Sequence, residues 1–131
     1  SWPTLQELID ADTRLLLFAH GDGMKSCSQI RCPEGIFYTF DHFQETEWDD
    51  VRTCRLNGEN NEVWAKGDGF FLMNHWKNNE KTELPSKSNA EEINTFEELT
   101  YRFGECEGRV PNVVSVDFWG VGDVLEFVRE A

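Results

Sequence analysis

Four short apolar segments, each followed by a polar or ionisable residue, constrain the fold of this chain most. They span residues 14–19, 35–40, 69–73 and 112–116. Continuous apolar runs of this length are typical of strands that are buried on both faces, as in a parallel sheet covered by helices. The sequence therefore predicts about four parallel strands whose C-terminal ends carry polar side chains.

Helical periodicity flanks these predicted strands. Thr4 and Glu7 form the pattern of a capping box at the start of a helix over residues 4–11. Apolar residues at helical spacing predict two more helices over residues 90–103 and 122–131. Strands that alternate with helices favour an α/β fold with an outer layer of helices.

The chain has 131 residues, of which 39% are hydrophobic, so it is long enough for one domain, residues 1–131, with its own core. A complete (β/α)₈ barrel takes about 250 residues. If the strands belong to a barrel, we expect a partial one, with both sheet edges open to a partner.

The net charge of −13 disfavours binding to nucleic acid and to anionic membrane surfaces. No apolar run approaches the ~20 residues of a transmembrane helix. The charge and the apolar runs therefore predict neither a nucleic-acid partner nor a transmembrane segment.

Four cysteines, Cys27, Cys32, Cys54 and Cys106, lie in loop-like surroundings without any Cys-x-x-Cys pair. This pattern favours disulfides over a zinc site and indicates an extracellular or other oxidising compartment of the secretory pathway. Four cysteines allow three pairings. The short separation of Cys27 and Cys32 favours that pair together with Cys54–Cys106.

Segments 2–9, 14–18, 70–75 and 109–118, in this order, resemble the second half of phosphatidylinositol-specific phospholipase C X-domain-like phosphodiesterases. The most specific is Pro-Asn-Val-Val-Ser-Val-Asp-Phe at residues 111–118, followed by Gly122-Asp123 and a terminal helix. The resemblance implies the second half of a TIM barrel, a partial (β/α) barrel of about four parallel strands.

In that family, two histidines on the early strands act as general base and general acid. Those strands have no counterpart in this sequence. The first hypothesis is therefore a C-terminal portion that needs a complementary N-terminal half, or another chain, to cleave an inositol phospholipid. The alternative is a non-catalytic structural or binding subunit that keeps the strands without the chemistry.

Five residues at the predicted strand ends are candidate site residues. By resemblance, Asp117 matches the last-strand aspartate that orients the general-base histidine, and the alternative is a structural carboxylate at the rim. Asp41 resembles a substrate-contacting acid. Asn74 and His75 could bind a phosphate or an inositol hydroxyl, although for His75 the favoured alternative is a histidine satisfied in the rim without a ligand. His20 lies on a glycine-flanked turn that can approach a substrate closely.

The remaining candidates concern a metal and an aromatic surface. No cofactor is predicted, but the acidic segment at residues 41–50 could hold Ca²⁺ through oxygen ligands, the alternative being a solvated charged loop. Trp48, Trp64, Trp76 and Trp119 could form an aromatic rim for lipid or sugar, although packing in the core or between chains is favoured.

Overall fold

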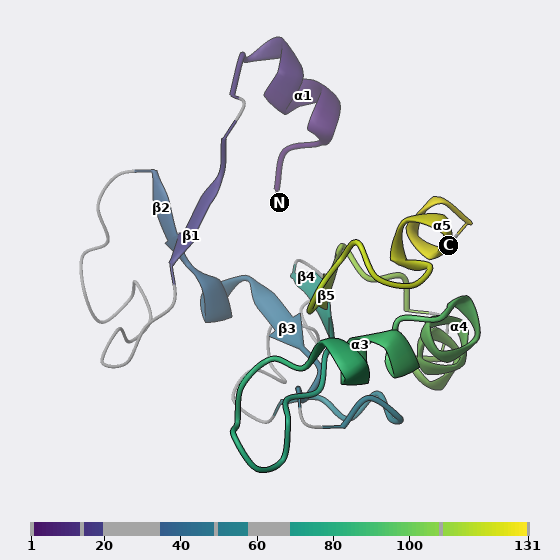
Figure 1. Cartoon of the computed structure of the whole chain (residues 1–131). Coiled ribbons are helices and arrows are strands. Elements are labelled where there is room, and N and C mark those ends of the chain that lie inside the picture. Colours follow the sequence, from purple (N-terminus) through teal and green to yellow (C-terminus); the bar gives the residue numbers. More distant parts are fainter. Residues whose placement is uncertain are drawn as a thin grey trace.

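The computed structural model describes residues 2–13, 15–19, 35–48, 50–57, 69–107 and 109–130 (Figure 1). These residues form a mixed α/β fold with short strands and short helices. In chain order the elements are α1 (Leu5–Asp10), β1 (Leu17–Ala19), β2 (Ile36–Tyr38), the 3₁₀ helix η1 (Thr39–Asp41), β3 (Phe43–Glu45), β4 (Phe70–His75), α3 (Lys87–Ile93), α4 (Phe96–Glu105), β5 (Val113–Val116) and α5 (Val124–Glu130).

All described strand pairings are parallel, as the apolar runs predicted. The strands form two small sheets, β1-β2 and β3-β4-β5. In the larger sheet, Glu45 pairs with Leu72, and Leu72 pairs with Val113. The parallel α/β part of the predicted fold is therefore confirmed.

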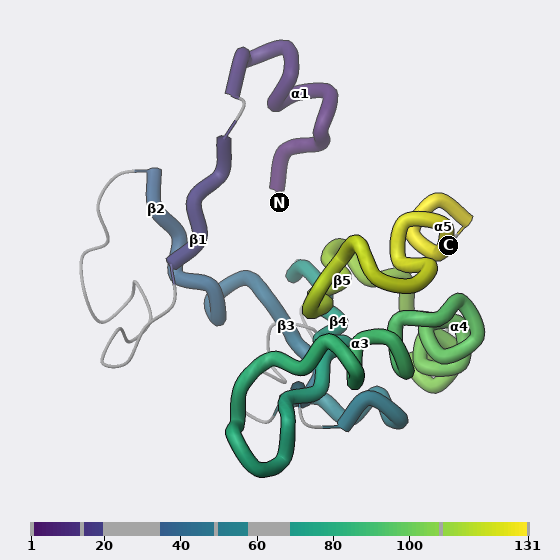
Figure 2. Tube along the Cα trace, viewed as in Figure 1, coloured from purple at the N-terminus to yellow at the C-terminus, as the bar shows by residue number. Residues whose placement is uncertain are grey.

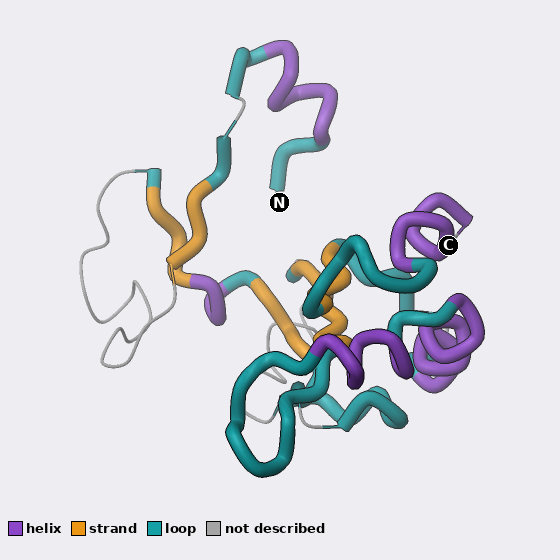
Figure 3. The backbone as a smooth tube through the Cα atoms, viewed as in Figure 1, coloured by secondary structure: helices purple, strands orange, loops and turns teal. Residues whose placement is uncertain are grey.

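The core lies between the three-stranded sheet and the helices that gather on one side of it (Figure 3). Phe71 and Met73 of β4 are fully buried there, against Leu99 of α4 and against Val124 and Phe127 of α5. Burial of each such side chain stabilises the fold by ~1.5–3 kcal/mol. The helix-facing side of the sheet therefore forms the hydrophobic core.

Trp2 joins the two sheets. Its ring centroid lies 5.0 Å from that of Phe37 in β2, 5.0 Å from that of Phe70 in β4 and 4.9 Å from that of His42. Helix α1 has no buried residue and stands apart from α3, α4 and α5 (Figure 2). Trp2, rather than α1, therefore connects the N-terminal segment to the strands.

The capping box of α1 is confirmed, since Thr4 accepts the Glu7 amide at 3.2 Å and Glu7 accepts the Thr4 amide at 2.7 Å. The prediction of one continuous helix over residues 90–103 is wrong. The segment is split into α3 and α4 because Thr95 acts as a new N-cap and accepts the Glu98 amide at 3.3 Å. Helix α3 begins before the predicted helix does, at Lys87, because Ser86 caps it and accepts the Asn89 amide at 3.3 Å.

A further difference is at residues 39–45, where the sequence predicted the end of a strand at residue 40 and an acidic loop from residue 41. The chain forms η1 and then β3, whose central residue Gln44 is fully buried. Gln44 is accommodated because its Nε2 donates to the carbonyls of Glu45 and Asn57, at 3.3 Å and 3.2 Å. This added strand brings a further set of side chains to the sheet.

Candidate functional site

A pocket of about 510 Å³ opens beyond the C-terminal ends of β2, β3 and β4. Parallel α/β sheets commonly bind ligands at this end of their strands. The lining side chains combine amide, carboxylate, hydroxyl and aromatic groups: Thr39, Phe40, Glu45, Trp48, Asn57, Asn74 and Trp76.

Strand alternation puts Asn74 and Glu45 on the pocket side of the sheet. Phe71 and Met73 point into the core, so Leu72 and Asn74 lie on the opposite face of β4. Glu45 pairs with Leu72 in the parallel register and so lies on that same face. Both polar side chains therefore meet at the carboxyl edge.

The Glu45 carboxylate is held by two amides. Its Oε1 accepts a hydrogen bond from Asn57 Nδ2 at 2.8 Å, and its Oε2 accepts one from Asn74 Nδ2 at 3.0 Å. Asn74 is itself fixed by Thr46, whose carbonyl accepts from Asn74 Nδ2 at 2.8 Å and whose Oγ1 accepts the Asn74 amide at 3.0 Å. Each carboxylate oxygen retains acceptor capacity for a ligand hydroxyl.

An aromatic pair forms another wall of the pocket. The rings of Trp48 and Trp76 stack with centroids 5.2 Å apart and planes 8° from parallel. Trp48 remains 48% exposed, and both indoles line the pocket. The pair therefore offers an apolar surface beside the Glu45 carboxylate, whereas the sequence favoured packing of these tryptophans in the core or between chains.

Residues 46–48 and 50–57, which we call the pocket loop, fold back beside β3 and carry Trp48 and Asn57. A β-bridge between Thr46 and Leu56 closes the loop, and the Asn57 amide donates to the Glu45 carbonyl at 2.9 Å. This return brings Asn57 to the carboxylate of Glu45.

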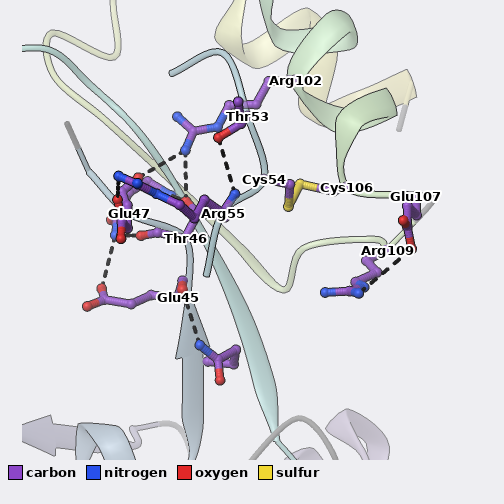
Figure 4. The surroundings of a disulfide bond; sticks show 12 residues. Glu45, Thr46, Glu47, Thr53, Cys54, Arg55, Arg102, Cys106, Glu107 and Arg109 are labelled. Carbon is purple, nitrogen blue, oxygen red and sulfur yellow. Dashed lines mark hydrogen bonds and ion pairs between the residues drawn. A yellow bond between two sulfur atoms is a disulfide. The ribbon is translucent and has the colours of Figure 1, made fainter. Parts of the chain in front are cut away.

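Helix α4 holds the pocket loop from behind (Figure 4). Arg102 Nη2 donates to Thr46 Oγ1 at 2.9 Å and to the Glu47 carbonyl at 3.0 Å. The disulfide Cys54–Cys106 ties the other side of the loop to the end of the helix. This predicted pair is confirmed, and it is compatible with an oxidising compartment. Cys27 and Cys32 lie outside the described residues.

Of the residues predicted to form a site, Asn74 lines the pocket. Asp41 lies in η1 and is half-buried, but it is not among the lining residues, although its neighbour Phe40 is. Asp117 follows β5 directly, and its Oδ2 is buried without a hydrogen-bond partner among the described residues. His20 lies outside the described residues.

His75 is placed away from the pocket, which corrects its predicted position at the open end of the strands. It is fully buried on the helix side of β4, where its Nε2 lies 2.8 Å from the Ile93 carbonyl. Burial lowers the pKa of His75 to about 4. The physical reason is alternation, since His75 follows Asn74 and must face the other way.

The prediction did not include Glu45 and Asn57 as binding residues. Glu45 was seen only as part of an acidic run, and it ends a three-residue strand, directly after the buried Gln44. Among the described residues, no group of three or more His, Cys, Asp or Glu side chains is arranged to hold a metal ion. Within the acidic segment, Glu47 pairs with Arg55, and Asp50 accepts from Thr53 Oγ1 at 2.7 Å.

No helix within the described ranges has the length and apolar character required to cross a bilayer.

Comparison with known proteins gives the family. The model of the PI-PLC X domain (PI-PLC X 1) matches residues 1–130. Neither the search of curated proteins nor the search of solved structures found a match. Since the matched region covers nearly the whole chain, the protein belongs to the PI-PLC X domain family and is a phospholipase-C-like domain.

Proposed function

We propose that this chain is the headgroup-binding portion of a phospholipase-C-like phosphodiesterase and that it binds the polyol ring of an inositol phospholipid in the pocket. The observation that carries the proposal is the Glu45 carboxylate, held by two amides at the C-terminal ends of parallel strands beside the Trp48–Trp76 stack.

The pocket chemistry suits a polyol better than a phosphate. Hydroxyl groups can donate to the carboxylate of Glu45 and accept from amide groups such as that of Asn57, whereas a phosphate would be repelled by the carboxylate. The C–H groups of a cyclic polyol can pack against the indole of Trp76, in the way that apolar surface is buried in most ligand pockets. We therefore assign the pocket to the ring of the headgroup.

Cleavage would require attack of a ring hydroxyl on phosphorus, with one group removing a proton and another protonating the leaving oxygen. Neither described histidine is placed for this work in the pocket. His42 packs in the aromatic cluster around Trp2, and His75 is buried behind the sheet. We infer that residues 1–131 act as one half-barrel domain and that a complementary half supplies the acid and base.

Asp117 has a role in such an assembly as a positioning residue. Asp117 directly follows the last strand, β5, and its Oδ2 is buried without a hydrogen-bond partner among the described residues. Among the described strands, β5 pairs only with β4. A complementary strand beside β5 could bring a histidine to this oxygen, and the carboxylate would then fix its tautomer and stabilise its protonated form.

A second candidate function is a binding subunit without chemistry. It is favoured by the placement of His42 and His75, neither of which lines the pocket. The two candidates agree on headgroup binding and differ only in whether a complementary half restores turnover.

The primary experiment is a titration of the chain with myo-inositol, followed by tryptophan fluorescence and by NMR. We expect the wild-type chain to bind myo-inositol and Glu45→Gln to weaken this binding at least tenfold. In the variant, the NH₂ group of the glutamine would face an NH₂ group of Asn57 or Asn74, so that one of the two hydrogen bonds is lost. Glu91→Gln is the matched control, since Glu91 lies exposed on α3 and pairs only with Lys87 in the described structure. The absence of saturable binding by the wild-type chain would refute the proposed function.

The second experiment separates the two candidates. The isolated chain should not cleave phosphatidylinositol above background, because missing acid–base groups each cost ~10²–10⁴-fold in rate. Addition of a complementary half that carries the histidines should restore turnover, and Asp117→Asn should then lower the rate while leaving inositol binding intact. A lack of turnover in the assembled barrel would favour the binding subunit.

A further inference from the structure

Arg102 is the most unusual buried residue of the described structure. It lies on α4 and is 0% exposed, yet its Nε and Nη1 have no hydrogen-bond partner among the described residues. Burial lowers the pKa of Arg102 to about 10, against the attraction of the nearby Asp50 carboxylate. Most of its hydrogen-bonding capacity therefore goes unused.

A guanidinium buried in this way is poorly explained by stability. Desolvation of a charge costs several kcal/mol, and apolar residues of similar volume often replace buried charged groups with no loss of stability. A methionine on α4 could fill much of the same space. A more informative feature of Arg102 is where its Nη2 points, because this nitrogen donates the hydrogen bonds to Thr46 and Glu47.

A continuous set of contacts leads from Arg102 to the pocket. Arg102 Nη2 donates to Thr46 Oγ1 at 2.9 Å, and the same oxygen accepts the main-chain amide of Asn74 at 3.0 Å. The Thr46 carbonyl accepts from Asn74 Nδ2 at 2.8 Å, and that amide donates in turn to Glu45 Oε2 at 3.0 Å. Asn74 lies in β4, Glu45 ends the adjacent strand β3, Thr46 directly follows Glu45, and Arg102 lies on α4.

We propose that Arg102 is a positioning residue that fixes the Asn74–Glu45 pair through Thr46 and thereby sets the affinity of the pocket for its polyol. This inference rests on the proposed function, since it assigns a purpose to the same site. Arg102 itself does not line the pocket, so any effect of its replacement on binding must pass through Thr46 or through the Glu47 carbonyl, which Nη2 also contacts. The Asn74 resonance reports on the route through Thr46.

The exposed tether between α4 and the pocket loop provides a matched comparison. Arg52 Nη1 pairs with Glu98 Oε2 at 3.0 Å, and the Arg52 side chain is 60% exposed. This ion pair links the same loop to the same helix but has no described contact with Thr46 or Asn74. Arg52→Gln removes one positive charge, as Arg102→Met does, and so controls for both the charge and the tether.

The test compares Arg102→Met, Arg102→Lys and Arg52→Gln by two readouts. The first is the side-chain amide resonance of Asn74 in ¹⁵N–¹H spectra of the ligand-free chain, which reports on the pair without any ligand. The second is the dissociation constant for myo-inositol. Thermal unfolding is followed in parallel to separate an effect on the pocket from an effect on the fold.

We expect Arg102→Met to shift the Asn74 resonance and to weaken inositol binding about tenfold or more, as loss of a charged hydrogen bond predicts. Arg102→Lys should give a smaller change in both, because an ammonium group can retain one of the two contacts. Arg52→Gln should leave both unchanged. If Arg102→Met does not fold, the lysine variant decides by the same measurements.

The result that would overturn the inference is an unchanged Asn74 resonance in folded Arg102 variants, even if their thermal stability falls. Unchanged inositol affinity in variants with a shifted resonance would overturn it as well. If the wild-type chain does not bind inositol, the proposed function fails, and the Asn74 resonance still shows whether Arg102 orders the pair.

Discussion

Gly122 offers a sharp test of how the turn before α5 packs. Its φ angle is +75°, and an ideal Cβ built there would lie 2.3 Å from the Asn94 carbonyl oxygen and 2.8 Å from its carbon. Asn94 is fully buried, and its carbonyl accepts the Asp123 amide at 2.7 Å. The clash is therefore with backbone that is held in place, and Gly122→Ala should be strongly destabilising.

The magnitude has two parts. A left-handed conformation costs a residue with a Cβ ~1–2 kcal/mol, and an overpacked atom typically costs ~1–3 kcal/mol more. Gly122→Ala should therefore lower the free energy of unfolding by about 2–5 kcal/mol. Gly35 isolates the first part, because its φ is +82° but no described atom lies within 4 Å of a Cβ built there. Gly35→Ala should cost only ~1–2 kcal/mol.

Gly104 is the opposite control. It lies within α4, its φ is not positive, and no described atom lies within 4 Å of its ideal Cβ. Gly104→Ala should raise the free energy of unfolding by ~0.5–1 kcal/mol, because alanine is the better helix former. Urea unfolding followed by circular dichroism measures all three variants. A cost for Gly122→Ala no larger than that for Gly35→Ala would refute the close approach to Asn94.

Three further predictions concern the folded chain. Replacing Cys54 and Cys106 by serine should destabilise the fold by about 4 kcal/mol in the chain-entropy model, given their separation of 52 residues, and urea unfolding with and without reductant checks this. Because the pKa of His75 is lowered to about 4 from the ordinary 6.5, the unfolded chain takes up the proton first as pH falls. Stability should thus be full above pH 6.5 and decline by about 3 kcal/mol toward pH 4, and His75→Gln should flatten this slope in unfolding curves measured across the range. Trp2→Leu should loosen the packing of β1 and β2 against β4, which Phe18 of β1 also contacts, so that amide exchange in β1 and β2 accelerates while β4 and α4 stay protected; equal acceleration in all four would contradict this role.

The elements that the sequence predicted well are those in which local pattern and tertiary environment agree. The capping box at Thr4 and Glu7 forms as expected, and four strands occur where apolar runs precede polar residues. β3 was missed because Gln44 is polar, and no local pattern reveals that the main chain of a loop thirteen residues away will satisfy its amide. Tertiary contacts override intrinsic strand preference here.

The candidate site shows the same division. Asn74 was identified because it ends an apolar run, and strand alternation applied one residue further would have turned His75 toward the helices. The role of Glu45 depends on Asn57, which reaches it only after the pocket loop has folded back. That return is stabilised by contacts with α4, about fifty residues later in the chain, which no local spacing reveals.

The charge of the chain leads to a final prediction about its complement. A phosphodiester is an anion, whereas this chain carries a net charge of −13 and places the Glu45 carboxylate within its pocket. The only described arginine bonded to the pocket loop from α4, Arg102, is buried behind the sheet and does not reach the pocket. If the chain docks against a complementary half, as proposed, we expect that half to supply positive groups that neutralise the phosphate and to have a basic facing surface. Association of the two halves should then weaken markedly as salt rises, since screening reduces attraction between opposite surface charges. Titration calorimetry at low and high salt measures this effect, and an affinity that does not depend on salt would contradict an electropositive complement.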